Sequence, residues 1–97
     1  MPTHEEEPGF WRDWTLLSQS QRTVFLMAVG KFNADLASGK GFRPGLRVKG
    51  VQGYSGVYEM TWANDGRATF SYGASIQPGS AHIIWRRVGS HNILKNP

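Results

Sequence analysis

Residues 81–94, with the sequence AHIIWRRVGSHNIL, decide how the rest of the chain is interpreted. Isoleucine, tryptophan and valine dominate positions 83–88, and a turn-forming QPGS segment precedes them at 77–80, so the stretch opens as a β-strand. Two arginines lie on this predicted strand, a Gly-Ser pair then bends the chain, and His91 follows at once. Arginine binds phosphate oxygens and histidine exchanges protons near neutral pH, so this strand end predicts a phosphodiester site.

The length of 97 residues predicts one domain, residues 1–97, with a single core. A composition that is 39% hydrophobic and 12% aromatic is typical of a folded protein. No apolar run approaches the roughly 20 residues of a membrane-spanning helix, and there is no cysteine. We therefore expect a cytoplasmic protein without a membrane partner or disulfides. Its three histidines are scattered, so we predict neither a metal site nor a cofactor.

The net charge of +4 is unevenly divided along the chain. Residues 1–38 carry three basic and five acidic side chains, whereas residues 39–97 carry eight basic and two acidic ones. The basic half indicates a polyanionic partner, either a nucleic acid or an acidic protein that masks this surface. A solvated basic face with no partner is the alternative.

Helical periodicity marks the first half of the chain. Residues 1–8 are Glu-rich and are predicted to be a loose acidic leader. A first helix begins near Phe10, where apolar residues recur about one turn apart. Ser18 and Gln21 form a capping-box pattern that starts a second helix, which runs to about Ala37. These segments predict a helical hairpin.

The second half changes to the two-residue period of β-strands. One strand is predicted around 46–51, a cleanly alternating one over 57–62, and another over 67–72 after an Asn-Asp-Gly hairpin turn. The strand at 82–88 completes the sheet. The predicted fold is therefore α+β, with an N-terminal helical hairpin packed on a curved antiparallel sheet of about four strands.

These elements, in this order, resemble the RelE/ParE superfamily of toxins from bacterial type II toxin–antitoxin systems. The resemblance covers roughly residues 8–95, and the Gly-Ser-His ending is most similar to the RelE/YafQ-like mRNA interferase branch. It rests on the segments FWRDW (10–14), LRVKGVQG (46–53), VYEM (57–60), GRATF (66–70) and VGSHNIL (88–94).

The resemblance implies that the protein cleaves mRNA in the ribosomal A site and that a cognate antitoxin covers its basic face. It also implies that His91 protonates the 5′-oxygen leaving group and that Arg67 stabilises the phosphate. Family members usually open with a short apolar strand, and some branches are basic where this chain has Glu59 and Thr61. These two positions therefore depart from the lysine-based chemistry of RelE and leave a carboxylate base open.

Metal-free RNA cleavage needs a base for the 2′-hydroxyl, an acid for the 5′-oxygen and positive charge around the phosphorane. The alternating strands place Glu59, Thr61 and Arg67 on one polar surface, which the last strand reaches with an arginine and His91. The catalytic candidates are His91, Arg67, Glu59 and Lys49, with Glu59 or Lys49 as base, and the candidates for RNA or phosphate binding are Arg47, Arg86, Arg87, Thr61 and Tyr54.

Two other functions fit the same sequence. The chain could be a ParE-like gyrase inhibitor that cleaves nothing, in which case His91 has no required role. It could also be a non-catalytic module that binds RNA or an antitoxin through its basic face.

Overall fold

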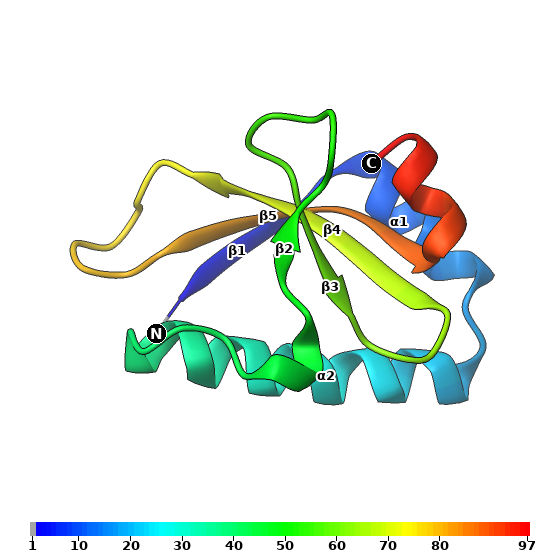
Figure 1. The fold of residues 1–97 in the computed structure, drawn as a ribbon, viewed down its shortest axis with the longest axis horizontal. Coiled ribbons are helices and arrows are strands. Elements are labelled where there is room, and N and C mark those ends of the chain that lie inside the picture. Colours follow the sequence, from blue (N-terminus) through cyan, green and yellow to red (C-terminus); the bar gives the residue numbers. More distant parts are fainter. Residues whose placement is uncertain (1) are drawn as a thin grey trace.

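The computed structural model describes residues 2–97 as an α+β domain built on a five-stranded mixed sheet (Figure 1). The strand order is β1-β5-β4-β3-β2, in which β1 runs parallel to β5 and the other pairs are antiparallel. The α+β class and the helices on a sheet are confirmed, with five strands where about four were predicted. The elements are β1 (Thr3–Glu6), α1 (Pro8–Leu16), α2 (Gln19–Ser38), the 3₁₀ helix η1 (Pro44–Leu46), β2 (Lys49–Gly50), β3 (Tyr58–Thr61), β4 (Gly66–Gly73), β5 (His82–Ser90) and the 3₁₀ helix η2 (His91–Lys95).

The acidic start of the chain is not the predicted loose leader. Thr3–Glu6 form the edge strand β1, which pairs in parallel with β5. His82 on β5 is buried, and its two ring nitrogens lie 2.7 Å from the Thr3 hydroxyl and 2.8 Å from a Glu5 carboxylate oxygen. Pro8 occupies the first turn of α1, where its missing N–H is harmless. Polar side chains thus form a strand here because their partners come from the far end of the sequence.

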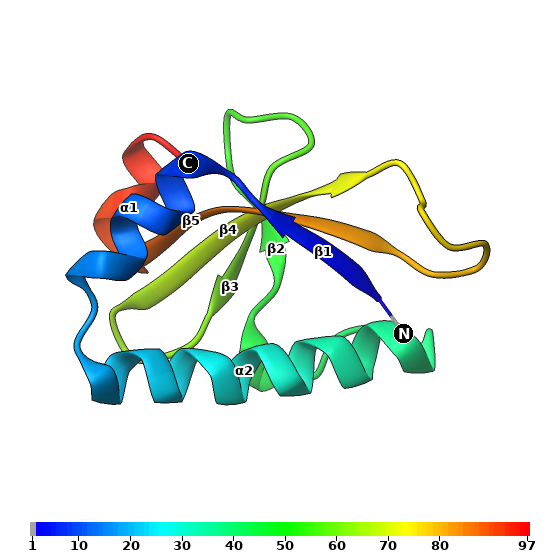
Figure 2. The same cartoon turned by 180° about the vertical axis from the view of Figure 1, so that it is seen from behind.

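The two helices begin and end close to the predicted residues. Ser18 caps α2 through the predicted capping box, in which its hydroxyl accepts from the Gln21 backbone N–H while the Gln21 side chain accepts from the Ser18 N–H. Gly39 ends α2 in the left-handed conformation, with φ at 68°. Figures 1 and 2 show α2 along one side of the sheet and η2 on the other side. Within residues 2–97, no helix is both long and apolar enough to cross a membrane.

The predicted strand at 46–51 is the least accurate of the strand predictions, because only Lys49–Gly50 are extended. Pro44 begins η1 instead, and Arg47 follows it with a left-handed backbone at φ 48°. A residue in that conformation turns the chain and cannot continue a strand. The other predicted strands are confirmed as β3, β4 and β5.

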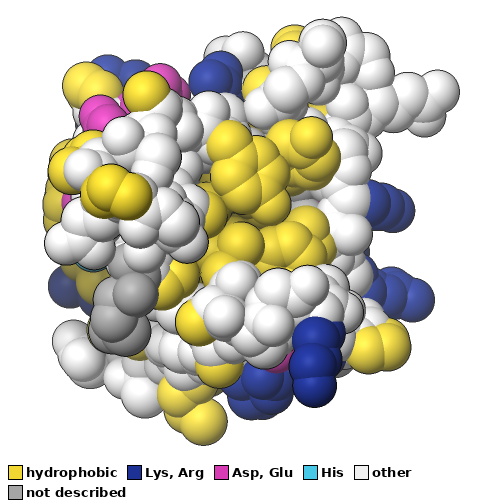
Figure 3. Space-filling view, turned by 90° about the vertical axis from the view of Figure 1, so that its left-hand side faces the viewer, with side chains coloured by type: hydrophobic (Ala, Val, Ile, Leu, Met, Phe, Trp, Pro, Cys, Tyr) yellow, Lys and Arg dark blue, Asp and Glu magenta, His cyan; other side chains and the backbone are white. Residues whose placement is uncertain are grey.

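The core lies between α2 and the sheet and is rich in aromatic rings. The core residues follow the helical period on α2, where they are three or four positions apart, and the two-residue period on the strands, where alternate residues belong to the core. Figure 3 shows that hydrophobic side chains also reach the surface in the centre of one end of the molecule. The buried core residues are Phe10, Phe25, Ala28, Phe32, Leu46, Met60, Trp62, Ala68, Phe70, Ile83, Trp85 and Val88.

Candidate active site

The sheet surface facing away from α2 contains a cleft of about 300 Å³. It forms because Met60 and Ala68 point into the core, so the residues that alternate with them point out on the other face. Cross-strand pairing then sets Lys49 opposite Glu59, and Thr61 opposite Arg67. Five of the predicted site residues meet here, together with one valine. The lining residues are Arg47, Val48, Lys49, Glu59, Thr61 and Arg67.

Glu59 is the only carboxylate among the residues 2–97 that line this cleft. The residue is only 6% exposed, and its Oε1 lies 3.9 Å from Nε of Arg67. A carboxylate removed from water is costly unless cations surround it, and Lys49 and Arg47 supply two more. Glu59 therefore lies among cations that also attract phosphate oxygens.

Arg67 has a second, structural role in the hairpin between β3 and β4. Its Nη1 donates to the carbonyl oxygens of Ala63, Asn64 and Gly66, at 3.4, 3.3 and 3.0 Å. The guanidinium fork is rigid, so these bonds fix the side of the group that faces Glu59. The position of Arg67 at the opening of β4 thus links the shape of the turn to the charge in the cleft.

His91 stands where β5 ends and η2 begins, outside the lining of the cleft. Its Nδ1 is hydrogen-bonded to the carboxylate of Asp65, and both side chains are largely exposed. The hydrogen bond from His91 holds the pKa of Asp65 below its usual value. With Nδ1 bound to the carboxylate, Nε2 is the nitrogen left to exchange a proton.

Asp65 contacts the candidate residue His91, and the sequence did not single it out because Asn-Asp-Gly was assigned only to a turn. The pairing of Gly66 with Ser90 across β4 and β5 places Asp65 beside His91. Ser90 also caps η2, because its hydroxyl accepts from the Asn92 N–H. The sequence could have revealed this contact only through the register of β4 and β5. That register pairs the Gly-Arg opening of β4 with the Gly-Ser pair that precedes His91.

Arg86 and Arg87, predicted to bind RNA or phosphate, do not line the cleft. The β4–β5 register shifts between Thr69 and Phe70 and leaves Arg86 without a partner opposite it, so both arginines reach the C-terminal segment. Arg86 Nε donates to the Pro97 oxygen at 3.1 Å. Neither side chain is available to a ligand in the cleft as the structure stands.

Arg87 is held by a carboxylate from α1. Its Nε and Nη2 donate to the two oxygens of Asp13 at 2.7 and 3.1 Å, and its Nη1 donates to the Asn96 carbonyl. The hydrogen bond with Asp13 raises the pKa of Arg87. Tyr54, the remaining candidate, also lies outside the cleft lining, and its hydroxyl donates to the Lys95 carbonyl oxygen at 3.3 Å. Arg87 thus ties α1 to Asn96, and Tyr54 ties the loop before β3 to η2.

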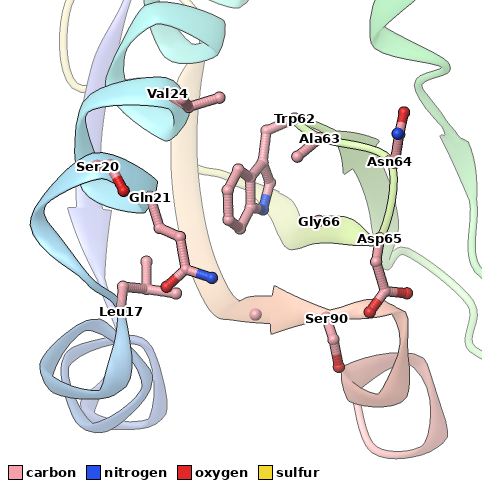
Figure 4. A pocket seen from close by; sticks show the side chains of 11 residues that line it. Leu17, Ser20, Gln21, Val24, Trp62, Ala63, Asn64, Asp65, Gly66 and Ser90 are labelled. Carbon is pink, nitrogen blue, oxygen red and sulfur yellow. The ribbon is translucent and has the colours of Figure 1, made fainter.

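A second pocket, of about 410 Å³, adjoins the Asp65 side chain on the α2 side of the hairpin (Figure 4). Trp62 forms its wall, and the Trp62 Nε1 is the only buried side-chain polar atom in residues 2–97 without a hydrogen-bond partner. Gly66 is required beneath this ring, because a Cβ at that position would lie 2.6 Å from the indole. Figure 4 shows Asp65 turned toward Ser90 at the end of β5.

Comparison with solved structures identifies proteins with this architecture. The chain matches one from the E. coli DinJ–YafQ toxin–antitoxin complex with a TM-score of 0.65 and 14% identity, over 96% of both chains. It matches a copper-bound mutant toxin from Helicobacter pylori with a TM-score of 0.66 and 16% identity, over 95% of this chain and 97% of that one. E. coli YafQ alone gives a TM-score of 0.61 and 13% identity, over 97% and 98% of the two chains.

The chain has the fold of the YafQ-type toxins. The resemblance predicted from its sequence is therefore confirmed at the level of the fold. No protein-family model matches the sequence, and no curated protein matches it. The YafQ-like fold was thus detectable from the order of its motifs, although few individual residues are shared. In this YafQ-like domain the cleft lies on β2, β3 and β4, while the Asp65–His91 pair lies at the junction of β4 and β5.

Proposed function

We propose that this protein is the toxin of a bacterial type II toxin–antitoxin system and that it inhibits translation as a ribosome-dependent mRNA endoribonuclease. The observation that carries the proposal is the cleft in which Glu59 lies among Lys49, Arg47 and Arg67. A buried carboxylate among cations offers both a base and positive charge, which are what 2′-hydroxyl attack on a phosphodiester needs. The YafQ-like fold supports the same assignment.

The reaction assigned to this site needs no metal ion. Glu59 takes the proton of the 2′-hydroxyl, whose oxygen attacks the adjacent phosphorus as the bond from phosphorus to the 5′-oxygen breaks. His91, protonated, gives its Nε2 proton to that departing oxygen. The products are a 2′,3′-cyclic phosphate and a 5′-hydroxyl. Lys49 is the alternative base, and Glu59 is preferred because it is the carboxylate that lines the cleft and lies 3.9 Å from Arg67 Nε.

Arg67 and Arg47 neutralise the charge that develops on the phosphorane. The guanidinium group suits this role because it stays protonated and its planar fork meets two phosphate oxygens at once. Asp65 acts through His91 and is a positioning residue, since its carboxylate is hydrogen-bonded to Nδ1 and orients the imidazole. Thr61 supplies a hydroxyl at the floor of the same cleft.

The partners of the proposed toxin follow from the same chemistry. Its substrate is mRNA in the ribosomal A site, so it acts in the cytoplasm. The cognate antitoxin is a protein that covers the basic surface and releases it when degraded. Exposed cations around Glu59 are a surface that an acidic partner can mask.

Induced expression in bacteria tests the nuclease assignment, with growth and the 5′ ends of cellular mRNA measured together. The natural chain should arrest growth and produce new 5′ ends inside codons, and His91→Ala should abolish both. His4→Ala is the matched control, since His4 is also an exposed histidine paired with a carboxylate, that of Glu6, but lies on β1. Arrest that survives His91→Ala without new 5′ ends would overturn the nuclease and favour gyrase inhibition. Neither arrest nor new 5′ ends would favour a non-catalytic module.

A further inference from the structure

A groove of about 540 Å³ continues from the cleft around the β3–β4 hairpin toward α2. It shares Arg47, Thr61 and Arg67 with the cleft, so the two hollows are neighbouring parts of one surface. Its other walls come from the outer side of α2, from η1 and from the hairpin turn. The three shared side chains are therefore within reach of a ligand in either hollow.

The groove is strongly basic. Lys31, Arg43, Arg47 and Arg67 line it, and no carboxylate is among its lining residues within the described part of the chain. Arg43 is held by Asp35, which lies outside the lining, with a bond of 2.8 Å from Nη2. Lys31 and Arg47 form no salt bridge within residues 2–97. Lys31 is thus left for an anionic ligand in the groove, beside Arg47, which also lines the cleft.

The floor of the groove is apolar, although it faces solvent. Val24 and Met27 on α2 are 43% and 62% exposed, and they lie one turn apart on the same side of the helix as Lys31. The fold itself does not use these exposed side chains. A basic rim above an apolar floor is the arrangement with which proteins bind single-stranded nucleic acid, because phosphates meet the cations and bases cover the apolar surface.

The backbone at Arg47 adds a further observation. Arg47 has a left-handed φ of 48°, a conformation that is costly for a residue with a side chain. Backbone strain of this kind collects at functional sites. The conformation places the guanidinium at the boundary between the cleft and the groove, where it lines both.

We propose that this groove binds the RNA strand next to the cleaved bond, with Lys31 and Arg47 contacting successive phosphates. The proposal rests on the proposed nuclease function and extends the binding site beyond the cleft to α2. Lys31 is then a phosphate-contacting residue some distance from the chemistry. It contributes to affinity and to the salt dependence of binding, and it has no part in proton transfer.

The salt dependence of RNA binding tests this proposal. Each cation–phosphate contact with a single strand contributes about 0.7 to the slope of log K against log salt. The probe is a labelled uridine oligonucleotide of about 12 nucleotides, comparable to single-strand site sizes, measured between about 50 and 200 mM salt. All variants carry His91→Ala so that the RNA stays intact. Lys31→Gln is compared with Lys40→Gln, a lysine that follows α2 and lines neither the cleft nor the groove.

The expected result is a slope about 0.7 less steep for Lys31→Gln and an unchanged slope for Lys40→Gln. Equal slopes in all proteins, or equal losses in both variants, would overturn the groove as an RNA site. So would a Lys31→Gln variant that binds RNA normally but loses affinity for an acidic peptide of glutamate and leucine, which would assign the groove to a protein partner. Because this readout is binding, its failure is distinguishable from the loss of cleavage that tests the nuclease itself.

Discussion

The carboxylate of Asp65 is hydrogen-bonded to Nδ1 of His91, although the two residues are 26 positions apart in the chain. The contact joins the β3–β4 turn to the start of η2 through the pairing of Gly66 with Ser90. Because the carboxylate occupies Nδ1, Nε2 is the ring nitrogen left for another partner. The pair therefore fixes which nitrogen of His91 is free at the junction of β5 and η2.

Asp65→Asn should slow RNA cleavage by about 10- to 100-fold while leaving His91 in place. The amide keeps the size of the side chain but replaces the charged acceptor with a neutral one, so it holds the imidazole less firmly in the orientation from which it donates. Cleavage rates in a purified translation system, followed by primer extension across a pH series, measure the effect. Glu6→Gln is the matched control, since it removes a carboxylate from the other exposed histidine pair. A rate and a pH profile equal to those of the natural protein would remove Asp65 from the site.

The parts of this protein that local sequence determines were predicted well. The capping box at Ser18 starts α2, and the alternation of Tyr58, Met60 and Trp62 gives the inward face of β3 and of the residue that follows it. Each of these signals involves residues within a few positions of one another, so periodicity and capping suffice to find them. The cleft followed from the same alternation, because Glu59 and Thr61 had to face the other way.

What the sequence did not predict depends on contacts between distant segments. The acidic strand β1 has no apolar pattern of its own and forms because β5 provides its hydrogen bonds and the buried His82. Arg86 and Arg87 looked like alternating neighbours, but the register shift in β4–β5 turns both toward the C-terminal segment. Asp65 belongs to this group too, since only the strand register brings it to His91.

His82→Ala should destabilise the protein by about 2 to 4 kcal/mol. The ring is 4% exposed and bridges the Thr3 hydroxyl and the Glu5 carboxylate, so its removal leaves a cavity and breaks both links to β1. Urea denaturation followed by tryptophan fluorescence measures the change. His4→Ala on the same edge should have little effect because that side chain is exposed. If both variants have the same urea midpoint of unfolding as the natural protein, β1 does not depend on His82.

Arg47→Gly should be more stable than Arg47→Ala by up to about 1 kcal/mol. Both variants lose the guanidinium, but only glycine relieves the left-handed backbone at φ 48°, and its greater flexibility when unfolded offsets part of the gain. Thermal unfolding of the two variants gives the comparison, and their RNA affinities should be equally reduced. A glycine variant that is clearly less stable than the alanine variant would show that this backbone is not strained.

Acidification should remove a stabilising contribution from Asp35 between about pH 4 and pH 2. Its carboxylate accepts hydrogen bonds from the side chain and the backbone N–H of Arg43, and these lower the pKa of Asp35 from 3.8 to about 2. Because the folded protein holds this proton more weakly than the unfolded chain does, the contribution is complete above pH 4 and is lost as the pH falls toward 2. Denaturation of the natural protein and of Asp35→Asn across this range should therefore show a stability difference that shrinks with acidification. A difference that stays constant down to pH 2 would mean that Arg43 does not hold Asp35 in solution.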